Sequence, residues 1–296
     1  MPVRTPARSR SRRLGAVVAA LVGTAFGLSA APAVAVPTCT FEAQTGVVTV
    51  VVGTGETAVV ARSGEAITLD GVACDTATVT TTDSIVVDGT AGGVNVTLDL
   101  SGGPFEPGMT PEPDGTSEIE ITLTVPGASN VLLAGSDAAD HFVLGTGGAN
   151  LNAAETPGDA DVSIDGTPGV TMQGNAGNDV LSVAGGAGTD APAAATVVGG
   201  SEDDDLIGAL GDSAFDGGDG VDALDYTAAA GILADLGGGL VLHAAGGQDT
   251  VANVEDLLGS PASDVIVGTE EANALAGADG DDRIDGGGGD DALDGG

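Results

Sequence analysis

Short segments that alternate apolar and polar residues dominate the chain after its first forty positions. The alternation is clearest in VNVTLDL at 94–100 and in IEITLTV at 119–125, where every second residue is Val, Ile or Leu. A period of two is typical of a strand with one buried face. No stretch after residue 35 shows a sustained helical period, so the sequence predicts an all-β fold. Further strands are expected at 47–52, 57–61, 78–87, 130–133 and 161–164.

In the C-terminal part, the apolar positions follow a nine-residue period. Glycines 259, 268, 277, 286 and 295 bound four nonapeptides, GSPASDVIV, GTEEANALA, GADGDDRID and GGGGDDALD. The eighth position is always Ile or Leu, and the sixth is Asp264, Asn273, Asp282 or Asp291. A fixed short period indicates a solenoid, in which each unit buries its apolar face only against its neighbours. Each unit is expected to be a glycine-rich turn followed by a very short strand with its aliphatic residue inward.

The sixth position carries the chemistry of the repeat. An acid there would sit where the carbonyl oxygens of the turn converge. Carboxylate and carbonyl oxygens suit a hard cation that takes six to eight oxygen ligands, and calcium is such a cation. The sequence therefore predicts calcium as the bound ion.

These repeats resemble the haemolysin-type, or repeats-in-toxin, calcium-binding repeat, whose pattern is GGxGxDxUx with U a large aliphatic residue. GGDGVDALD at 217–225 matches every defined position, and GNAGNDVLS at 174–182 comes close. The resemblance implies a parallel β-roll in which two nonapeptides make one coil, so that partner turns lie about eighteen residues apart. Asp204 would then face Asp222, Asp264 would face Asp282, and Asn273 would face Asp291.

The resemblance also implies a set of calcium ligands. The side chains would come from Asp179, Asp204, Asp222, Asp264, Asn273, Asp282 and Asp291, and the turn backbone from Gly174, Gly177, Gly217, Gly218, Gly220, Gly277, Gly280, Gly286, Gly287 and Gly289. The units starting at 185, 199 and 208 depart from the pattern at Pro192, Glu202 and Ser213 and are expected to bind weakly or not at all. GSDAADHFV at 135–143 is a degenerate outlier.

The repeats divide the chain into regions. The expected order is an N-terminal β region at 36–172, a first repeat block at 173–225, spacer coils at 226–258 and a second block at 259–296. For 36–172 two architectures fit, a small antiparallel sandwich or an irregular β-helix continuous with the repeats. Three-residue apolar segments at coil-like intervals favour the second, giving a parallel β-solenoid in which a β-helix leads into a β-roll. The last two glycines begin a further repeat and no polar cap follows, so either the second block is truncated or the solenoid closes in another way.

The N-terminus predicts export. Five arginines precede an apolar segment at 14–31, and Ala33-Val34-Ala35 provides a cleavage site, so residues 1–35 are expected to be a signal peptide rather than a membrane anchor. The features leave both the general secretory and the twin-arginine route open. The protein is therefore expected to be secreted, and association with the cell wall is compatible with this.

Removal of the signal peptide would leave Arg62 and Arg283 as the only basic residues against 44 acidic ones, a formal charge of −42. Such a chain repels nucleic acid and anionic membranes, and no membrane insertion is expected after cleavage. Calcium ions are the partner that this charge favours. The sequence identifies no protein or cell-surface partner.

Cys39 and Cys74 are the only cysteines. In an exported protein, an even pair is most simply one disulfide, and two separate buried thiols are the alternative.

The residues do not predict an enzyme. The chain has two histidines, no GxSxG and no HExxH motif, and its GDS sequence at 211–213 lies in phase inside a repeat. The expected function is a non-catalytic calcium-binding protein that folds on Ca²⁺ outside the cell, in adhesion or in matrix or cell-wall association. The alternative is the accessory repeat region of an exported hydrolase whose catalytic part is absent from this chain.

Overall fold

The computed structural model describes residues 36–110, 118–151 and 160–296, which belong to one compact unit. Every regular element in these ranges is a β-strand, so the predicted all-β class is confirmed. The described part of the chain also contains no helix long and apolar enough to cross a membrane. The predicted signal peptide at 1–35 lies outside the described residues.

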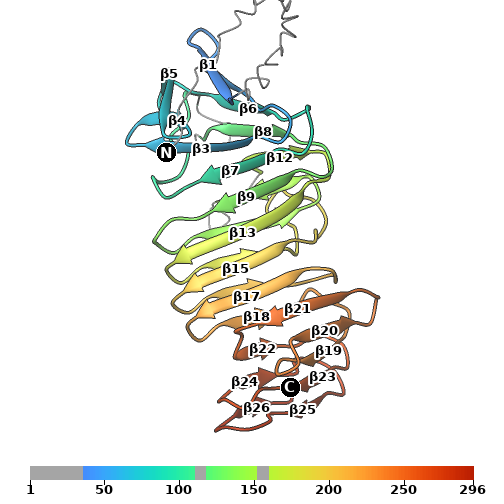
Figure 1. Cartoon of the computed structure of the whole chain (residues 1–296). Helices are drawn as coiled ribbons and strands as arrows, with labels where there is room; N and C mark the ends of the chain where they lie inside the picture. The colour runs from blue at the N-terminus through green and yellow to red at the C-terminus, as the bar shows by residue number, and fades with distance from the viewer. Residues whose placement is uncertain (1–35, 111–117, 152–159) are drawn as a thin grey trace, which may run out of the picture. The chain divides into compact units, whose positions relative to one another are not determined.

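The strands form two sheets of thirteen strands each (Figure 1). The first sheet has the spatial order β1 (Thr38–Glu42), β2 (Val47–Val51), β6 (Ser84–Asp88), β8 (Glu120–Thr124), β12 (Val162–Asp165), β11 (Gly148–Asn150), β10 (His141–Gly145), β14 (Val180–Ser182), β16 (Asp205–Ile207), β18 (Ala223–Asp225), β22 (Asp256–Leu258), β24 (Ala274–Ala276) and β26 (Ala292–Asp294). The second sheet has the order β25 (Arg283–Asp285), β23 (Val265–Val267), β19 (Ile232–Asp235), β20 (Leu240–His243), β21 (Gln248–Ala252), β17 (Ala214–Asp219), β15 (Thr196–Ser201), β13 (Gly169–Ala176), β9 (Asn130–Ala134), β7 (Asn95–Asp99), β3 (Thr57–Ser63), β4 (Ala66–Leu69) and β5 (Val72–Thr78).

Most neighbouring strands are parallel. From β13 to β18 the chain passes from one sheet to the other with every strand, so each strand pairs with the strand two places later in the sequence. Antiparallel pairs are confined to β1 with β2, β3 to β5, β10 to β12 and β19 to β21. The last of these groups occupies the spacer at 226–258.

The strands of residues 36–172 belong to the same two sheets as the repeat strands. β2, β6 and β8 are parallel neighbours in the first sheet, and β7, β9 and β13 are parallel neighbours in the second. A separate antiparallel sandwich is therefore not formed by this region.

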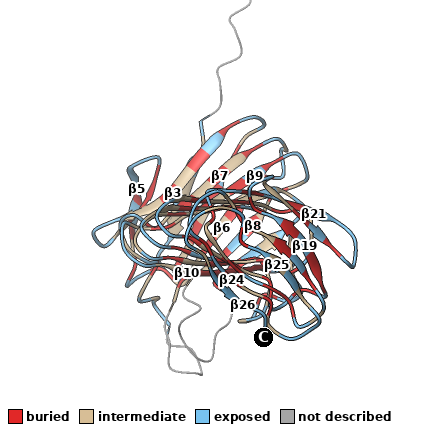
Figure 2. Ribbon diagram, turned by 90° about the horizontal axis from the view of Figure 1, so that it is seen from below, coloured by how far each residue is buried: buried red, intermediate tan, exposed pale blue. Residues whose placement is uncertain are grey.

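Buried residues lie mainly on the strands, and exposed residues gather at the turns (Figure 2). The buried residues are mostly aliphatic and form one core cluster. Several N-terminal strands bury two aliphatic residues, such as Ile85 and Val87 of β6. The three-residue strands of the repeats bury at most one, such as Leu206 of β16 or Leu224 of β18, and β25 and β26 bury none. Each buried side chain of this kind contributes about 1.5–3 kcal/mol, so the C-terminal strands gain less from apolar burial than the N-terminal ones.

The strand predicted at 78–87 is wrong over its first half. β5 ends at Thr78 and β6 begins at Ser84, because the carbonyl oxygen of Thr78 accepts the backbone N–H groups of Thr81 and Thr82 in a turn. The hydroxyl of Thr81 also accepts the backbone N–H of Thr78. Local hydrogen bonds from threonine therefore override a sequence with high strand propensity.

Cys39 of β1 and Cys74 of β5 form the predicted disulfide. The bond joins the first strand of one sheet to the last strand of the other. For a loop of 35 residues, the chain-entropy model gives a stabilisation of about 3–4 kcal/mol.

Candidate cation-binding turns

Acidic residues that directly precede strands of the first sheet are joined into a column by backbone hydrogen bonds. The N–H of Asp140 donates to Oδ1 of Asp179 at 2.7 Å, and the N–H of Asp179 donates to Oδ1 of Asp204 at 2.8 Å. The N–H of Asp204 in turn donates to Oδ1 of Asp222 at 2.9 Å. Oδ1 of Asp179, Asp204 and Asp222 therefore each accepts a hydrogen bond from the backbone of the preceding turn.

The column continues through the spacer. The N–H of Asp222 donates to Oε2 of Glu255 at 3.0 Å, and Nδ2 of Asn273 donates to the carbonyl oxygen of Glu255 at 2.6 Å. The N–H of Asn273 donates to Oδ1 of Asp291 at 3.1 Å. We call the seven residues the acid column: Asp140, Asp179, Asp204, Asp222, Glu255, Asn273 and Asp291.

A shorter column precedes the strands of the second sheet. The N–H of Ile232 donates to Oδ1 of Asp264 at 2.7 Å, and the N–H of Asp264 donates to Oδ1 of Asp282 at 2.9 Å. The three pairings predicted from the eighteen-residue offset are therefore confirmed as contacts.

Four of these carboxylates keep their second oxygen free. Oδ2 is buried and has no hydrogen-bond partner in Asp179, Asp204, Asp222 and Asp282, as far as the described residues reach. A buried carboxylate oxygen without a donor is costly, because the charge has lost its hydration. Such an atom needs an explanation, and a bound cation is one.

The first glycine of each repeat places a carbonyl oxygen beside the free carboxylate oxygen. A Cβ atom at Gly199 would overlap Oδ2 of Asp204 and lie 2.5 Å from the carbonyl oxygen of Gly217. A Cβ atom at Gly174 would overlap Oδ2 of Asp179 in the same way. The space beside the glycine therefore holds a carboxylate oxygen and the carbonyl oxygen of the neighbouring turn, which are ligands of the kind that calcium prefers.

The other predicted turn glycines allow close packing of the turns. A Cβ atom on any of them would meet backbone atoms of the preceding turn. This holds for Gly177, Gly218, Gly220, Gly280, Gly287 and Gly289. Gly277 and Gly286 instead lie against their own Asp282 and Asp291, as Gly217 lies against Asp222.

In three turns, a Ser or Thr at the second repeat position donates its backbone N–H to the side chain at the sixth position. The N–H of Ser260 donates to Oδ2 of Asp264 at 2.6 Å, and the N–H of Ser136 donates to Oδ2 of Asp140 at 2.6 Å. Asn273 is held likewise by the N–H of Thr269 at 2.7 Å. Both predicted ligand positions in this group, Asp264 and Asn273, thus have their side-chain oxygens occupied by hydrogen bonds.

No model of a protein family matches this chain, and no curated protein matches it.

In the described ranges, no group of three or more His, Cys, Asp or Glu side chains is placed to hold a metal ion. A cation beside Asp204 or its neighbours would therefore take most of its ligands from backbone carbonyl groups. Calcium accepts such ligands.

Three of the free carboxylates, Asp179, Asp204 and Asp222, have a raised pKa. Burial raises the pKa of Asp179 to about 7 and that of Asp222 to about 6, and neighbouring carboxylates add to both shifts. Burial also raises the pKa of Asp204. Without a cation, burial therefore opposes the charged form of these groups.

Without calcium, the protein is expected to gain stability on acidification. The folded-state pKa values of Asp179 and Asp222 exceed the unfolded value of about 3.9, so the native state binds more protons between pH 4 and 7. Their contribution is complete below about pH 4 and is lost as the pH rises through about 7. In calcium-free buffer, the free energy of unfolding should rise from pH 8 to pH 5 by an amount on the order of 1–3 kcal/mol, measured as a higher midpoint of thermal unfolding. A double variant with Asp179→Asn and Asp222→Asn should flatten this profile, and an equally steep profile in the variant would contradict the assignment.

Neither histidine is a member of the two columns, although His141 directly follows Asp140. Nε2 of His243 lies 2.7 Å from Oδ2 of Asp249, which also accepts the hydroxyl of Tyr226 at 2.8 Å. This buried network, to which Ser213 donates its backbone N–H, raises the pKa of Tyr226 through burial and the adjacent carboxylate. His141 is half-buried in β10, and burial lowers its pKa. Within the described ranges, no hydrogen bond joins either histidine to a serine hydroxyl.

Sequence reasoning missed two members of the acid column and the buried network. Asp140 lies in the degenerate outlier and Glu255 in the spacer, where no repeat could be recognised. A usable signal was present, because each directly precedes a short apolar strand, as Asp204 and Asp222 do. Asp249 instead lies inside β21, in the spacer, where no nine-residue period could be recognised.

Proposed function

We propose that this chain is a secreted calcium-binding protein of the haemolysin-type repeat family, without catalytic activity of its own. Its two sheets would form a parallel β-solenoid that passes from an irregular β-helix at 36–172 into calcium-binding coils. Binding of Ca²⁺ outside the cell would complete the folding of those coils.

One observation carries the proposal. Asp179, Asp204 and Asp222 each bury a carboxylate oxygen that has no donor, beside a glycine that leaves room for nothing larger. A calcium ion would supply the positive charge and accept these oxygens together with turn carbonyl groups. Zinc fits the donor set poorly, because it prefers the nitrogen and sulfur ligands that these turns lack.

The structure favours a ranking of the proposed ligands. Asp179, Asp204, Asp222 and Asp282 offer a free oxygen, whereas Asp264 and Asn273 must first exchange a bond to Ser260 or Thr269. Asp291 lies at the less buried end of the acid column. The first block is therefore proposed to bind at least as tightly as the second. This includes the unit at 199, which Glu202 led us to expect to bind weakly, because Oδ2 of its Asp204 is free.

Export is proposed from the leader at 1–35 and from the disulfide, which is typical of oxidising compartments. The acidic mature chain would neither bind nucleic acid nor insert into a membrane. Adhesion or association with an extracellular matrix or cell wall is the role that fits a cation-dependent scaffold without a catalytic group.

Calorimetric titration of residues 36–296 tests the proposal. Calcium should bind at several sites, and magnesium, which demands a stricter octahedral geometry, should bind more weakly. Asp282→Ala should lower the number of bound calcium ions, and Asp190→Ala should not. A hydrolase screen on the same sample should show no turnover above a His141→Ala control. Absence of calcium binding at millimolar concentrations would sink the proposal.

A further inference from the structure

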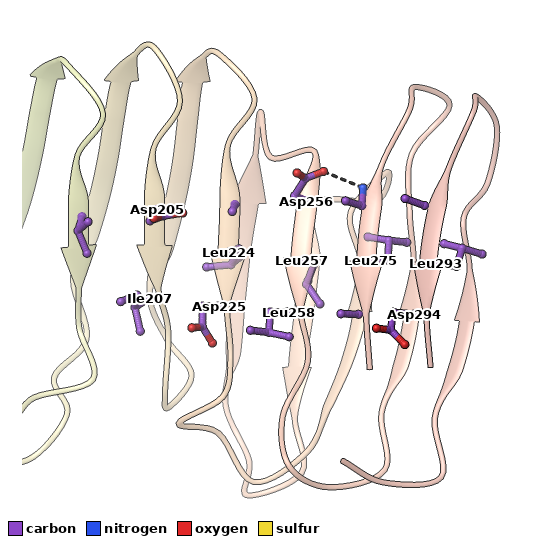
Figure 3. A pocket seen from close by; sticks show the side chains of 15 residues that line it. Asp205, Ile207, Leu224, Asp225, Asp256, Leu257, Leu258, Leu275, Leu293 and Asp294 are labelled. Atoms are coloured by element: carbon purple, nitrogen blue, oxygen red, sulfur yellow. Dashed lines mark hydrogen bonds between the residues drawn. The ribbon is translucent and has the colours of Figure 1, made fainter. Parts of the chain in front are cut away.

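An open groove runs across the outer face of the first sheet, on the side away from the core (Figure 3). Its volume is about 480 Å³, within the range of small-molecule sites. The side chains in it form rows that cross β16, β18, β22, β24 and β26. The register makes these rows straight, because Asp205 pairs with Ala223 and Ala223 with Asp256.

The floor of the groove is apolar. Ala223, Ala274 and Ala276 present methyl groups there, and Ile207 and Leu258 lie beside them. The backbone groups of the floor strands are used in the parallel ladders between them. The floor can therefore contact an aliphatic chain but offers few hydrogen bonds to a polar one.

Carboxylates stand along the groove at wide spacing. Asp205 and Asp256 are two strands apart, which is about 9.5 Å, and Asp225 and Asp294 are three strands apart, which is about 14 Å. A single metal ion cannot bridge such a pair, since oxygen ligands of calcium lie at about 2.3–2.6 Å. Oδ1 of Asp256 accepts the N–H of Ala274 at 2.7 Å, so this carboxylate is fixed in direction.

In its described ranges, the chain has no basic side chain that could neutralise the carboxylates of the groove. Arg62 and Arg283 are the only basic residues outside the first thirteen positions. Arg62 donates to the carbonyl oxygens of Pro104 and Glu106, and Arg283 belongs to β25 of the second sheet. A ligand that complements the groove must therefore bring several positive charges separated by apolar segments.

We propose that this groove binds a linear aliphatic polyamine, with its methylene segments on the alanine floor and its ammonium groups at the carboxylates. A polyamine fits better than a peptide. The amide groups of a peptide need hydrogen-bond partners when they are desolvated, and the floor provides few. Ammonium groups form charge-assisted hydrogen bonds with carboxylates, and methylene groups need no partner.

The first test separates the groove from diffuse attraction to an acidic protein. Diamines from 1,3-diaminopropane to 1,8-diaminooctane carry the same charge and differ only in methylene number. In saturating calcium and 0.15 M salt, their affinity for residues 36–296 should rise with length, by up to about fourfold for each added methylene. Diffuse attraction gives a flat or falling series, because charge density falls with length. A flat or falling series would overturn the proposal.

The second test places the ligand. Asp225→Asn with Asp256→Asn keeps the hydrogen-bond acceptor Oδ1 in each residue and should weaken spermine binding by about three- to tenfold. The matched control is Asp99→Asn with Asp165→Asn, which removes the same charge outside the groove and should change binding less than twofold. Equal weakening by the two pairs would contradict the proposal.

The third test addresses the floor. Ala223→Gln with Ala274→Gln leaves the charge unchanged and should abolish the dependence on methylene number. Persistence of that dependence would contradict the floor contact. The affinity of a lysine-bearing octapeptide is measured beside that of 1,8-diaminooctane. Tighter binding of the peptide would indicate that the groove binds peptides and would contradict the assignment to a polyamine.

Discussion

Removal of calcium is expected to destabilise the C-terminal half of the mature chain, so that this half unfolds in part at neutral pH, and to leave the N-terminal half folded. Circular dichroism of residues 36–296 should show a partial loss of β signal in chelator, and recovery in millimolar calcium. Each occupied site contributes about 2.7 kcal/mol when calcium exceeds Kd by a hundredfold. Three or four such sites would together contribute about 8–11 kcal/mol, which is comparable to the whole stability of an ordinary domain.

The two halves differ in their apolar cores. β2 and β6 bury two residues each, including Val48, Val50 and Ile85, whereas Leu206 and Leu257 are the single buried residues of β16 and β22. Without a cation, the acid column adds buried negative charge to the weaker half. Apolar burial alone should therefore keep the N-terminal strands folded but leave the repeats only marginally stable.

Limited proteolysis shows which region of the chain loses its structure in chelator. In chelator, cleavage should concentrate between 173 and 296, and calcium should suppress it. Magnesium at the same concentration is the control for ionic strength and should protect less. Identical spectra and identical cleavage with and without calcium would contradict the coupling of binding to folding.

Asp204→Asn is expected to change stability in opposite directions with and without calcium. In calcium, the loss of a charged ligand should destabilise by about 2–4 kcal/mol. In calcium-free buffer, the same change removes a buried charge without a donor, while its Oδ1 still accepts the N–H of Asp179. The variant should then be more stable than the wild type by about 1–3 kcal/mol.

Asp205→Asn is the matched control. Asp205 is the next residue in the sequence and carries the same charge, but its side chain is exposed on the outer face of β16. Its substitution should change stability by less than about 0.5 kcal/mol in either buffer. Thermal unfolding of both variants in both buffers measures the comparison. A loss of stability for Asp204→Asn in calcium-free buffer would show that the carboxylate serves the apo fold rather than a cation.

The part of the site that the sequence predicts follows from its period. Where nonapeptides follow one another without interruption, an offset of eighteen residues brings Asp264 to Asp282 and Asn273 to Asp291. Alternation likewise located strands such as β7 and β8, because a buried face requires a period of two.

The other contacts of the site could not be predicted, because insertions between the repeats interrupt the nine-residue period. Asp179 meets Asp204 across 25 residues and Asp222 meets Glu255 across 33, because longer connections and a hairpin intervene. The sequence also did not reveal that Ser260 would satisfy Asp264. That hydrogen bond depends on the local shape of one turn, and it reverses the order in which the turns are expected to bind.

A structure of residues 36–296 with calcium bound is the most direct measurement of the central claim. Anomalous scattering should place ions beside Gly174, Gly199 and Gly217, about 2.3–2.6 Å from Oδ2 of the acid in each turn and from turn carbonyl oxygens. Ions found only at exposed carboxylates such as Asp205, with Oδ2 of Asp204 still without a partner, would contradict the account.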